Sequence, residues 1–291
     1  MTDGVLDGYG IFGNRNSLDY LAELNPCGRA TAREASHFSH WSYSNFWECP
    51  LRYFWLVVDR RVPARPPDKR GTLEGGAMHL AIENFIRERP GDIANWCQHY
   101  ARMYFDQYLH SIKEGFRWKT ATDSADAYDK YLGLLARACS YVRTRVFDDP
   151  MVREAVVELP FVVKVLPDVT VGGRMDLLMV KQANPEAPMF LDVVDWKGTS
   201  RAGSVSREQL IFYGLGGMGV RNLPVRLVSF AFPGLNKESL YRFKEEDYEG
   251  FIFKLKGISE KIKQDKRIPT KQRKNCRYCL YSEECEDKPF E

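Results

Sequence analysis

The apolar residues of this chain change their spacing at Pro150, and this change restricts the possible folds strongly. Within residues 123–147 they recur at three- and four-residue intervals, which is the period of a helix with one buried face. Beyond Pro150 the runs EAVVELPFVVKV, VTVGGRMDLLMV and MFLDVVDWK are rich in β-branched residues, which predicts three strands. A mainly helical part should therefore be followed by a sheet.

Further elements are predicted on both sides of these strands. Upstream, helices are predicted from Ser42, placed as an N-cap, from Pro50, placed in a first turn, within GGAMHLAIENFI, and at residues 93–110. Downstream, SREQLIFYGLG predicts a helix, VRLVSFAFP a buried strand, and KEEDYEGFIFKLKGISEKIK a long helix. This order predicts an α/β fold in which helices flank a central mixed sheet.

Acidic and basic side chains concentrate on the second and third predicted strands. In DVVDWK, Asp195 and Lys197 are two residues apart and project from the same face of a strand, whereas Trp196 points to the other face. If the two strands form a hairpin, Asp176 lies beside them. Two carboxylates and a lysine suit phosphodiester hydrolysis with a hard divalent cation. The short D-x-K pattern also arises by chance, so an exposed ion pair is the alternative.

Other polar residues are expected to lie near this group. Gln209 and Tyr213 are four apart on the next helix and share one face. His79 offers an imidazole as a further ligand, although a single histidine on a helix is often structural. Glu158, in ELPF, could serve a second cation or be a surface glutamate.

Three cysteines near the end of the chain have the spacing C-x2-C-x5-C: Cys276, Cys279 and Cys285. In a reducing compartment such a pattern favours a metal site over disulfides. Most zinc and iron–sulfur sites have four protein ligands, so a fourth ligand is expected elsewhere in the chain.

The basic residues are unevenly distributed. The net charge is only +3, but residues 254–277 contain ten lysines and arginines and two acidic residues. A solvated helix face explains this pattern, and so does contact with DNA phosphates. The candidates for phosphate contact are Lys261, Lys263, Lys266 and Arg267.

The order G-x-x-H, G-G-R-x-D, D-x-K and Q-x-x-x-Y resembles the RecB-type branch of the PD-(D/E)XK nuclease superfamily over roughly residues 40–290. The AddB nuclease domain and the CRISPR-associated adaptation exonucleases belong to this branch. The resemblance implies a restriction-endonuclease-like core that binds Mg²⁺ or Mn²⁺. By this resemblance, the metal ligands would be His79, Asp176, Asp195 and the carbonyl of Trp196. Lys197 would be the catalytic lysine, and Gln209 and Tyr213 would support the site.

The resemblance extends to the cysteines. SYSNFWECPLRYFW is similar to an upstream segment that supplies one ligand of a four-iron four-sulfur (4Fe-4S) cluster in this branch. It implies that Cys49 joins the three C-terminal cysteines and that the cluster fastens the two ends of the domain together. Cys27 and Cys97 are interpreted as ordinary thiols and Cys139 as a packing residue.

The implied activity is a divalent-metal-dependent DNA exonuclease that acts on single strands or duplex ends. The sequence contains no P-loop, so the chain is not expected to unwind DNA with ATP by itself. A partner protein, either a helicase or a component of recombination or CRISPR adaptation, is therefore a possibility. The alternatives are a non-catalytic DNA-binding module and a zinc-stabilised interaction module. One departure from the usual D-x-K-T is Gly198, which separates Lys197 from Thr199.

The predicted domain organisation is simple, because no repeat or low-complexity linker divides the 291 residues. Residues 1–40 are predicted to be irregular and residues 41–291 to form one nuclease domain. Within it we expect a helical part (41–150), a catalytic α/β core (151–235), and a basic helix with the cysteine segment (236–291). No signal peptide or run of eighteen apolar residues is present, which predicts a cytoplasmic protein without membrane contact, in the host cytoplasm if phage-encoded. The sequence does not specify an oligomeric state.

Overall fold

The computed structural model describes residues 36–62, 70–113, 124–197, 206–232, 235–270, 276 and 279–287. The helices are α2 (His40–Glu48), α3 (Pro50–Tyr53), α4 (Arg70–Glu88), α5 (Ile93–Lys113), α6 (Ser124–Val142), α7 (Arg207–Arg221) and α8 (Glu245–Lys263), with π-helical turns η2 (Phe54–Val58) and η3 (Arg143–Phe147). The strands are β1 (Ser36–Phe38), β2 (Val152–Leu166), β3 (Val169–Lys181), β4 (Phe190–Trp196), β5 (Val225–Phe232) and β6 (Lys237–Tyr241).

The six strands form one mixed sheet in the order β1-β3-β4-β5-β6, and β2 also pairs with β3. The pairs β2–β3, β3–β4 and β5–β6 are antiparallel, whereas β1–β3 and β4–β5 are parallel. Helix α7 makes the connection between the parallel strands β4 and β5, as such a crossover requires. The predicted mixed sheet with flanking helices is confirmed.

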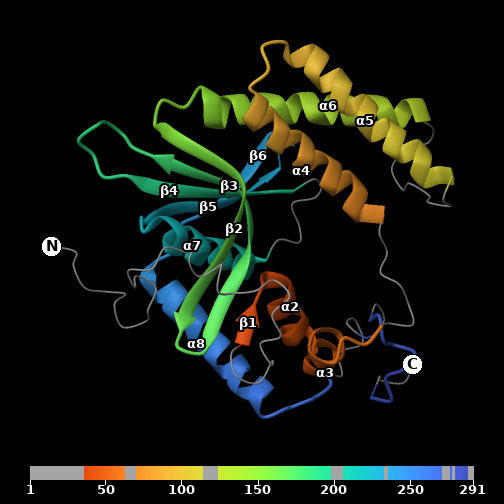
Figure 1. Cartoon of the computed structure of the whole chain (residues 1–291), viewed down its shortest axis with the longest axis vertical. Helices are drawn as coiled ribbons and strands as arrows, with labels where there is room; N and C mark the ends of the chain where they lie inside the picture. The colour runs from red at the N-terminus through yellow and green to blue at the C-terminus, as the bar shows by residue number, and fades with distance from the viewer. Residues whose placement is uncertain are drawn as a thin grey trace.

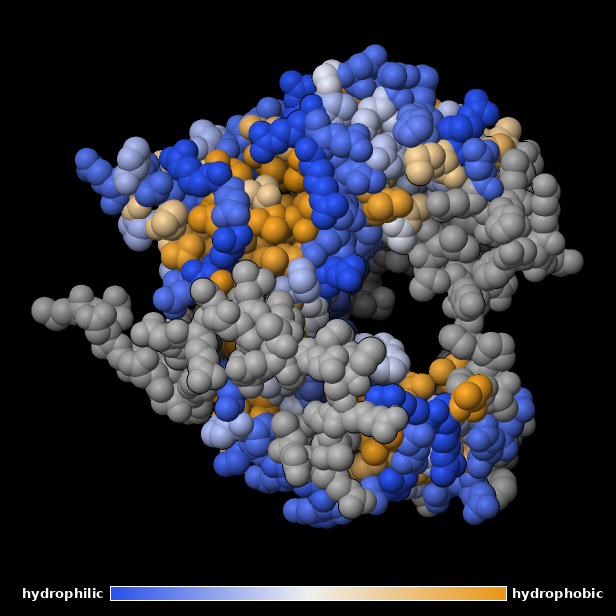
Figure 2. Space-filling view, in the orientation of Figure 1, coloured by the Kyte–Doolittle hydropathy of each residue, from blue (hydrophilic) through white to orange (hydrophobic). Residues whose placement is uncertain are grey.

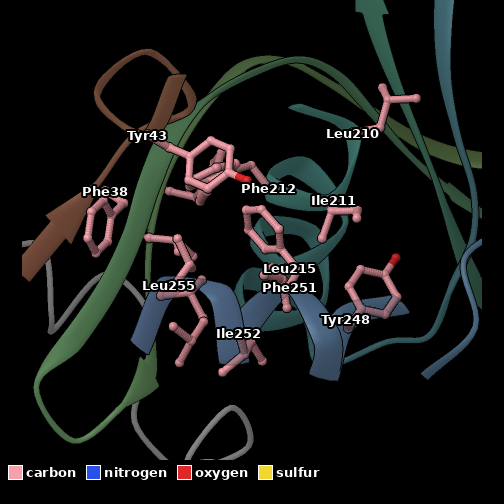
Figure 3. Packing of buried hydrophobic residues seen from close by; sticks show 14 of the residues in the cluster. Phe38, Tyr43, Leu210, Ile211, Phe212, Leu215, Tyr248, Phe251, Ile252 and Leu255 are labelled. Atoms are coloured by element: carbon pink, nitrogen blue, oxygen red, sulfur yellow. The ribbon is translucent and has the colours of Figure 1, made fainter. Parts of the chain in front are cut away.

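Two apolar layers enclose the sheet. Helices α4, α5 and α6 cover one face, and α7 and α8 cover the other (Figure 1). On the second face, Tyr43 of α2, Phe212 of α7 and Phe251 of α8 pack against one another, and their ring centroids are 5.1–5.7 Å apart (Figure 3). The space-filling view shows an opening between the part of the molecule that carries α4 and the part that carries α2 and α3 (Figure 2).

Helix α7 lies very close to the sheet because glycines face the strands. A Cβ added at Gly216 would lie 2.7 Å from the ring of Phe161, and one added at Gly219 would lie 2.4 Å from Val163. Real Cβ atoms do not approach other atoms so closely, so only glycine allows this packing. The close approach brings the N-terminal turns of α7, which carry Gln209 and Tyr213, next to the end of β4.

The structure corrects several sequence-based expectations. Helix α2 begins one residue after Ser39, which is the N-cap in place of Ser42; the Ser42 side chain completes the capping box. Strands β1 and β6 were not predicted, and β1 lies within the segment expected to be irregular. Strand β1 has three residues, too few for a periodic signal, and pairs with β3 through tertiary contact alone. Cys27 and Thr199 lie outside the described residues.

None of the helices searched in the described ranges is long and apolar enough to cross a membrane.

Candidate functional site

The centre of the site lies where β3 and β4 separate. Their ladder runs from Lys181/Phe190 to Leu177/Val194, and the next residues along it are Asp176 and Asp195. Asp176 Oδ2 accepts a hydrogen bond from the backbone N–H of Trp196 at 2.7 Å. The hairpin predicted from the sequence therefore brings the two carboxylates together.

A group of possible metal ligands forms next to this hairpin. One side-chain atom each of His79, Glu158 and Asp176 lies within 4.8 Å of the others. Nδ1 of His79 is 3.5 Å from Asp176 Oδ1 and 3.9 Å from Glu158 Oε1, and its Nε2 is 3.0 Å from the carbonyl oxygen of Trp196. Carboxylate, carbonyl and imidazole groups are donors that Mn²⁺ and Mg²⁺ accept. These residues therefore fit a hard divalent cation.

Glu158 reaches this group through an unusual backbone conformation. Its φ is 51°, in the left-handed region, although it lies inside β2. Its neighbours Val157 and Leu159 pair with Leu177 and Met175, so Glu158 stands opposite Asp176. A non-glycine residue in this region costs about 1–3 kcal/mol, and such residues concentrate at functional sites. The conformation supports Glu158 as a ligand, a role the sequence left open.

Asp195 and Lys197 belong to a hydrogen-bonded network with α7. Lys197 Nζ lies 2.6 Å from Asp195 Oδ2 and donates to Gln209 Oε1 at 3.2 Å. The amide of Gln209 donates in turn to Asp195 Oδ1 and to the hydroxyl of Tyr213, both at 3.0 Å. Lys197 Nζ also lies 4.9 Å from the centre of the Phe230 ring. Thus Gln209 holds both members of the D-x-K pattern, and Tyr213 holds Gln209.

The titration of the site reflects its crowded negative charge. Burial and repulsion from Asp176 raise the pKa of Asp195 to about 6, against the opposing effect of Lys197. Burial disfavours the charged form of His79, but hydrogen bonds with Asp176 and Glu158 and the charge of Asp195 outweigh it and raise the pKa of His79 to about 10. Asp195 therefore holds a proton more readily than an ordinary aspartate, and His79 stays protonated beside the carboxylates unless another cation takes the place of its charge.

The sequence matches a known protein family over the part of the chain that carries this site. The profile of the PD-(D/E)XK nuclease superfamily matches residues 37–286, which include every residue of the site. The chain belongs to this superfamily. No curated protein is similar enough in sequence to count as a match. A solved structure described as "Crystal structure of SSO0001" is 13% identical, and the match covers 77% of this chain and 100% of that chain with a TM-score of 0.31.

Membership in the PD-(D/E)XK superfamily implies nuclease activity and the use of Mg²⁺ or Mn²⁺. The mixed sheet and its helices agree with the restriction-endonuclease-like core of this superfamily. The structure brings together His79, Asp176, Asp195, Trp196, Lys197, Gln209 and Tyr213. Their individual roles stay predictions, and the carboxylate of Asp195 faces Lys197 and Gln209 while Glu158 faces His79.

The four cysteines assigned to a cluster meet in one pocket of this superfamily member. Cys49, Cys276, Cys279 and Cys285 line it together with Arg52 and Thr270. The backbone N–H of Thr270 donates to Cys49 Sγ at 3.5 Å, and Cys276 Sγ lies 3.6 Å from the carbonyl of Thr270. Residues far apart in the chain thus come together here, as the cluster hypothesis requires.

Cys97 and Cys139 are neighbours in the helical part. Both are buried, and their sulfurs lie 3.6 Å apart between α5 and α6. Cys139 is a packing residue as predicted, but Cys97 has a thiol partner that the sequence did not indicate.

The four basic residues proposed to contact DNA differ in their surroundings. Lys263 forms an ion pair with Asp168. Arg267 binds Asp59 through two hydrogen bonds of 2.6 and 3.1 Å and covers the ring of Phe54. Lys261 and Lys266 are exposed. Lys263 and Arg267 thus join distant parts of this fold, and contact of the set with DNA stays a prediction.

We expect Glu158→Gln to weaken Mn²⁺ binding by about tenfold, because charge count sets the affinity of a carboxylate site for a hard cation. The amide keeps the shape of the side chain and removes its charge. Calorimetric titration with Mn²⁺ measures the effect, and Glu154→Gln, an exposed change on the same strand, is the control. Equal affinities of the two variants would remove Glu158 from the metal site.

We expect Asp195→Asn to raise the melting temperature of the metal-free protein at pH 8. The pKa of Asp195 is about 6 in the folded protein and 3.8 for the ordinary side chain. The contribution of Asp195 to the free energy of unfolding is therefore highest below about pH 3.8, where Asp195 is protonated, and it falls as the pH rises through about 6 and the buried side chain becomes charged. Asparagine cannot acquire this charge, and the gain should reach up to about 3 kcal/mol.

The gain from Asp195→Asn should shrink as the pH is lowered from 8 to 5, which thermal denaturation in EDTA measures. Asp129→Asn, an exposed change on α6, is the control. A variant that melts below the parent at pH 8 would show that the contact with Lys197 outweighs the cost of burying the Asp195 charge.

Proposed function

We propose that this PD-(D/E)XK protein is a RecB-type, divalent-metal-dependent DNA nuclease that acts as an exonuclease on single strands or duplex ends. The observation that carries the proposal is the group of His79, Glu158 and Asp176 beside the Asp195–Lys197–Gln209 network. A binding module has no need for such a combination, because clustered buried carboxylates repel a polyanion unless a cation is held there.

His79, Glu158, Asp176 and the carbonyl of Trp196 are the residues that would hold the cation, with Asp195 at their side. Mg²⁺ or Mn²⁺ would supply Lewis-acid polarisation of the scissile phosphate and a lower pKa for water. The ammonium of Lys197 is held by Asp195 and Gln209 and would stabilise charge that develops on the phosphate. Tyr213 restrains Gln209 and so fixes the position of Lys197.

We also propose that the four cysteines bind a 4Fe-4S cluster. Their common pocket supports this assignment, since four thiolate ligands match what such a cluster takes from a protein. Arg52 lines the same pocket and its charge lowers the pKa of Cys279, although burial raises that pKa overall. Iron and sulfide analysis of anaerobically purified protein separates a cluster from zinc.

The proposed activity is tested with end-labelled single- and double-stranded DNA in Mn²⁺ and in Mg²⁺. A closed circular single strand of the same length is the control. An exonuclease should degrade the linear strands and leave the circle intact. Cleavage of the circle at the same rate would replace the exonuclease with an endonuclease. A lack of cleavage on all substrates, with the cation bound, would favour the non-catalytic module.

A further inference from the structure

A second charged cavity lies at the edge of the sheet, away from the residues of the active centre. It has a volume of about 650 Å³ and is lined by Arg145, Arg226, Leu227, Glu238, Leu240 and Arg242. Arg145 comes from η3, Arg226 and Leu227 come from β5, and Glu238 and Leu240 come from β6, the last strand in the order of the sheet. Three guanidinium groups therefore face one cavity that no role assigned so far explains.

Two of these arginines are held in place by the fold. Arg145 donates to Glu238 at 3.1 Å, and Glu238 also accepts from the buried hydroxyl of Ser229 at 2.6 Å. Arg226 binds Asp192 through two hydrogen bonds of 3.1 and 2.6 Å, and its guanidinium lies 4.1 Å from the centre of the Phe190 ring. Because these side chains are already ordered, a ligand that binds them loses little of its binding energy to side-chain entropy.

The charges around the cavity leave one cation in excess. Asp192 is buried and also contacts Lys181 at 3.1 Å, and Lys181 in turn binds Asp149 at 2.8 Å. The three carboxylates of Asp149, Asp192 and Glu238 thus offset the three cations of Lys181, Arg145 and Arg226. Arg242 is exposed, and it has no ion pair or hydrogen bond within the described ranges. Each guanidinium has five N–H donors, so the paired arginines also have donors left for an anionic oxygen.

We infer that this cavity binds a phosphate group of a nucleic acid strand outside the active centre, an inference that rests on the proposed nuclease function. Arginine binds phosphate oxygens in a two-pronged geometry, and three arginines at one cavity match this chemistry. Small-molecule sites enclose most of their ligand, whereas this cavity opens along the sheet edge and suits an extended strand that crosses it.

The cavity and the active centre are close together along the sheet. Leu227 pairs with Asp192 on β4, three residues before Asp195, a separation of about 10 Å along a strand, and the side chains of Asp192 and Asp195 project from opposite faces. Tyr141 is near both places, because its ring packs edge-on against Trp196 with the centroids 6.0 Å apart and Arg145 and Glu238 are close enough to affect its pKa. The cavity would therefore hold the backbone a few nucleotides from the bond that is cut.

The test is binding of fluorescent single-stranded DNA to the full chain by anisotropy, with Ca²⁺ in place of Mg²⁺ and Mn²⁺, so that a hard cation offsets the carboxylates of the active centre without the ions proposed for cleavage. Two lengths are compared, a 30-mer that can span both sites and a 4-mer that cannot. Arg242→Gln is the main variant, because its side chain supports no internal contact in the described structure. Arg102→Gln, an exposed arginine of α5, is the control for the loss of one charge.

We expect Arg242→Gln to weaken 30-mer binding about threefold to tenfold and to lower the dependence of log K on log salt by about 0.7, the value for one contact to a single strand. Arg242→Gln should bind the 4-mer with the affinity of the parent. Arg102→Gln should bind both the 4-mer and the 30-mer with the affinity of the parent. An Arg242→Gln variant with parental affinity and salt slope would overturn the inference, and so would an equal loss for both variants. These results are independent of cleavage, so they stand apart from a failure of the proposed nuclease activity.

Discussion

Replacing Lys197 by alanine should lower DNA cleavage by at least about a hundredfold, the scale expected when one positioned electrostatic group is lost. Lys197 Nζ is held by Asp195 and Gln209 at 2.6 and 3.2 Å, so it is fixed before any substrate arrives. Its interaction with the phosphate strengthens as negative charge develops during the reaction. DNA affinity and the fold should stay near those of the parent.

A comparison with Asp195→Ala separates chemistry from metal binding. Both variants should lose cleavage, but Asp195→Ala should also bind Mn²⁺ more weakly by calorimetry. Lys197→Ala should bind the ion at least as well as the parent, since a nearby positive charge is gone. Arg207→Ala, which removes an exposed cation from the same end of α7, is the control and should cleave normally. Parental cleavage by Lys197→Ala in both Mg²⁺ and Mn²⁺ would contradict the nuclease proposal.

Cys49→Ser should lose iron and sulfide as completely as Cys279→Ser, although the two residues are separated by most of the chain. Both line the same pocket, and four ligands share one cluster. The loss should also lower the melting temperature, because a cluster that joins residue 49 to residues 276–285 closes a very long loop and restricts the unfolded chain.

Cys97→Ala is the matched control, since Cys97 lies between α5 and α6 beside Cys139 and outside the pocket. It should retain the full iron and sulfide content. If Cys49→Ser kept its iron and sulfide while Cys279→Ser lost them, the upstream ligand would be another residue, such as Cys27. A stoichiometric zinc content without sulfide in the parent would replace the cluster with a zinc site.

The sequence by itself determined the types of the long elements and much of the site. Helices α4 to α8 and strands β2 to β5 were predicted because apolar spacing reports local burial, which depends on each segment separately. The same local geometry put Asp195 and Lys197 on one strand and Gln209 and Tyr213 on one face of α7. These pairs needed only one hairpin and one crossover helix to come together.

Only the tertiary structure decided the contacts between distant segments. The sequence left Glu158 open between a cation ligand and a surface glutamate, and only the structure shows its positive φ and its proximity to His79, which lies on a helix some eighty residues earlier in the sequence. The ion pair of Arg267 with Asp59 and the contact of the Cys97 thiol with Cys139 also join segments that are far apart in the sequence. Periodicity reports which face of a segment is buried but not which segment covers it. The partners were selected by the packing of α4 on the sheet for His79, of α5 on α6 for Cys97, and of the segment after α8 beside the end of η2 for Arg267.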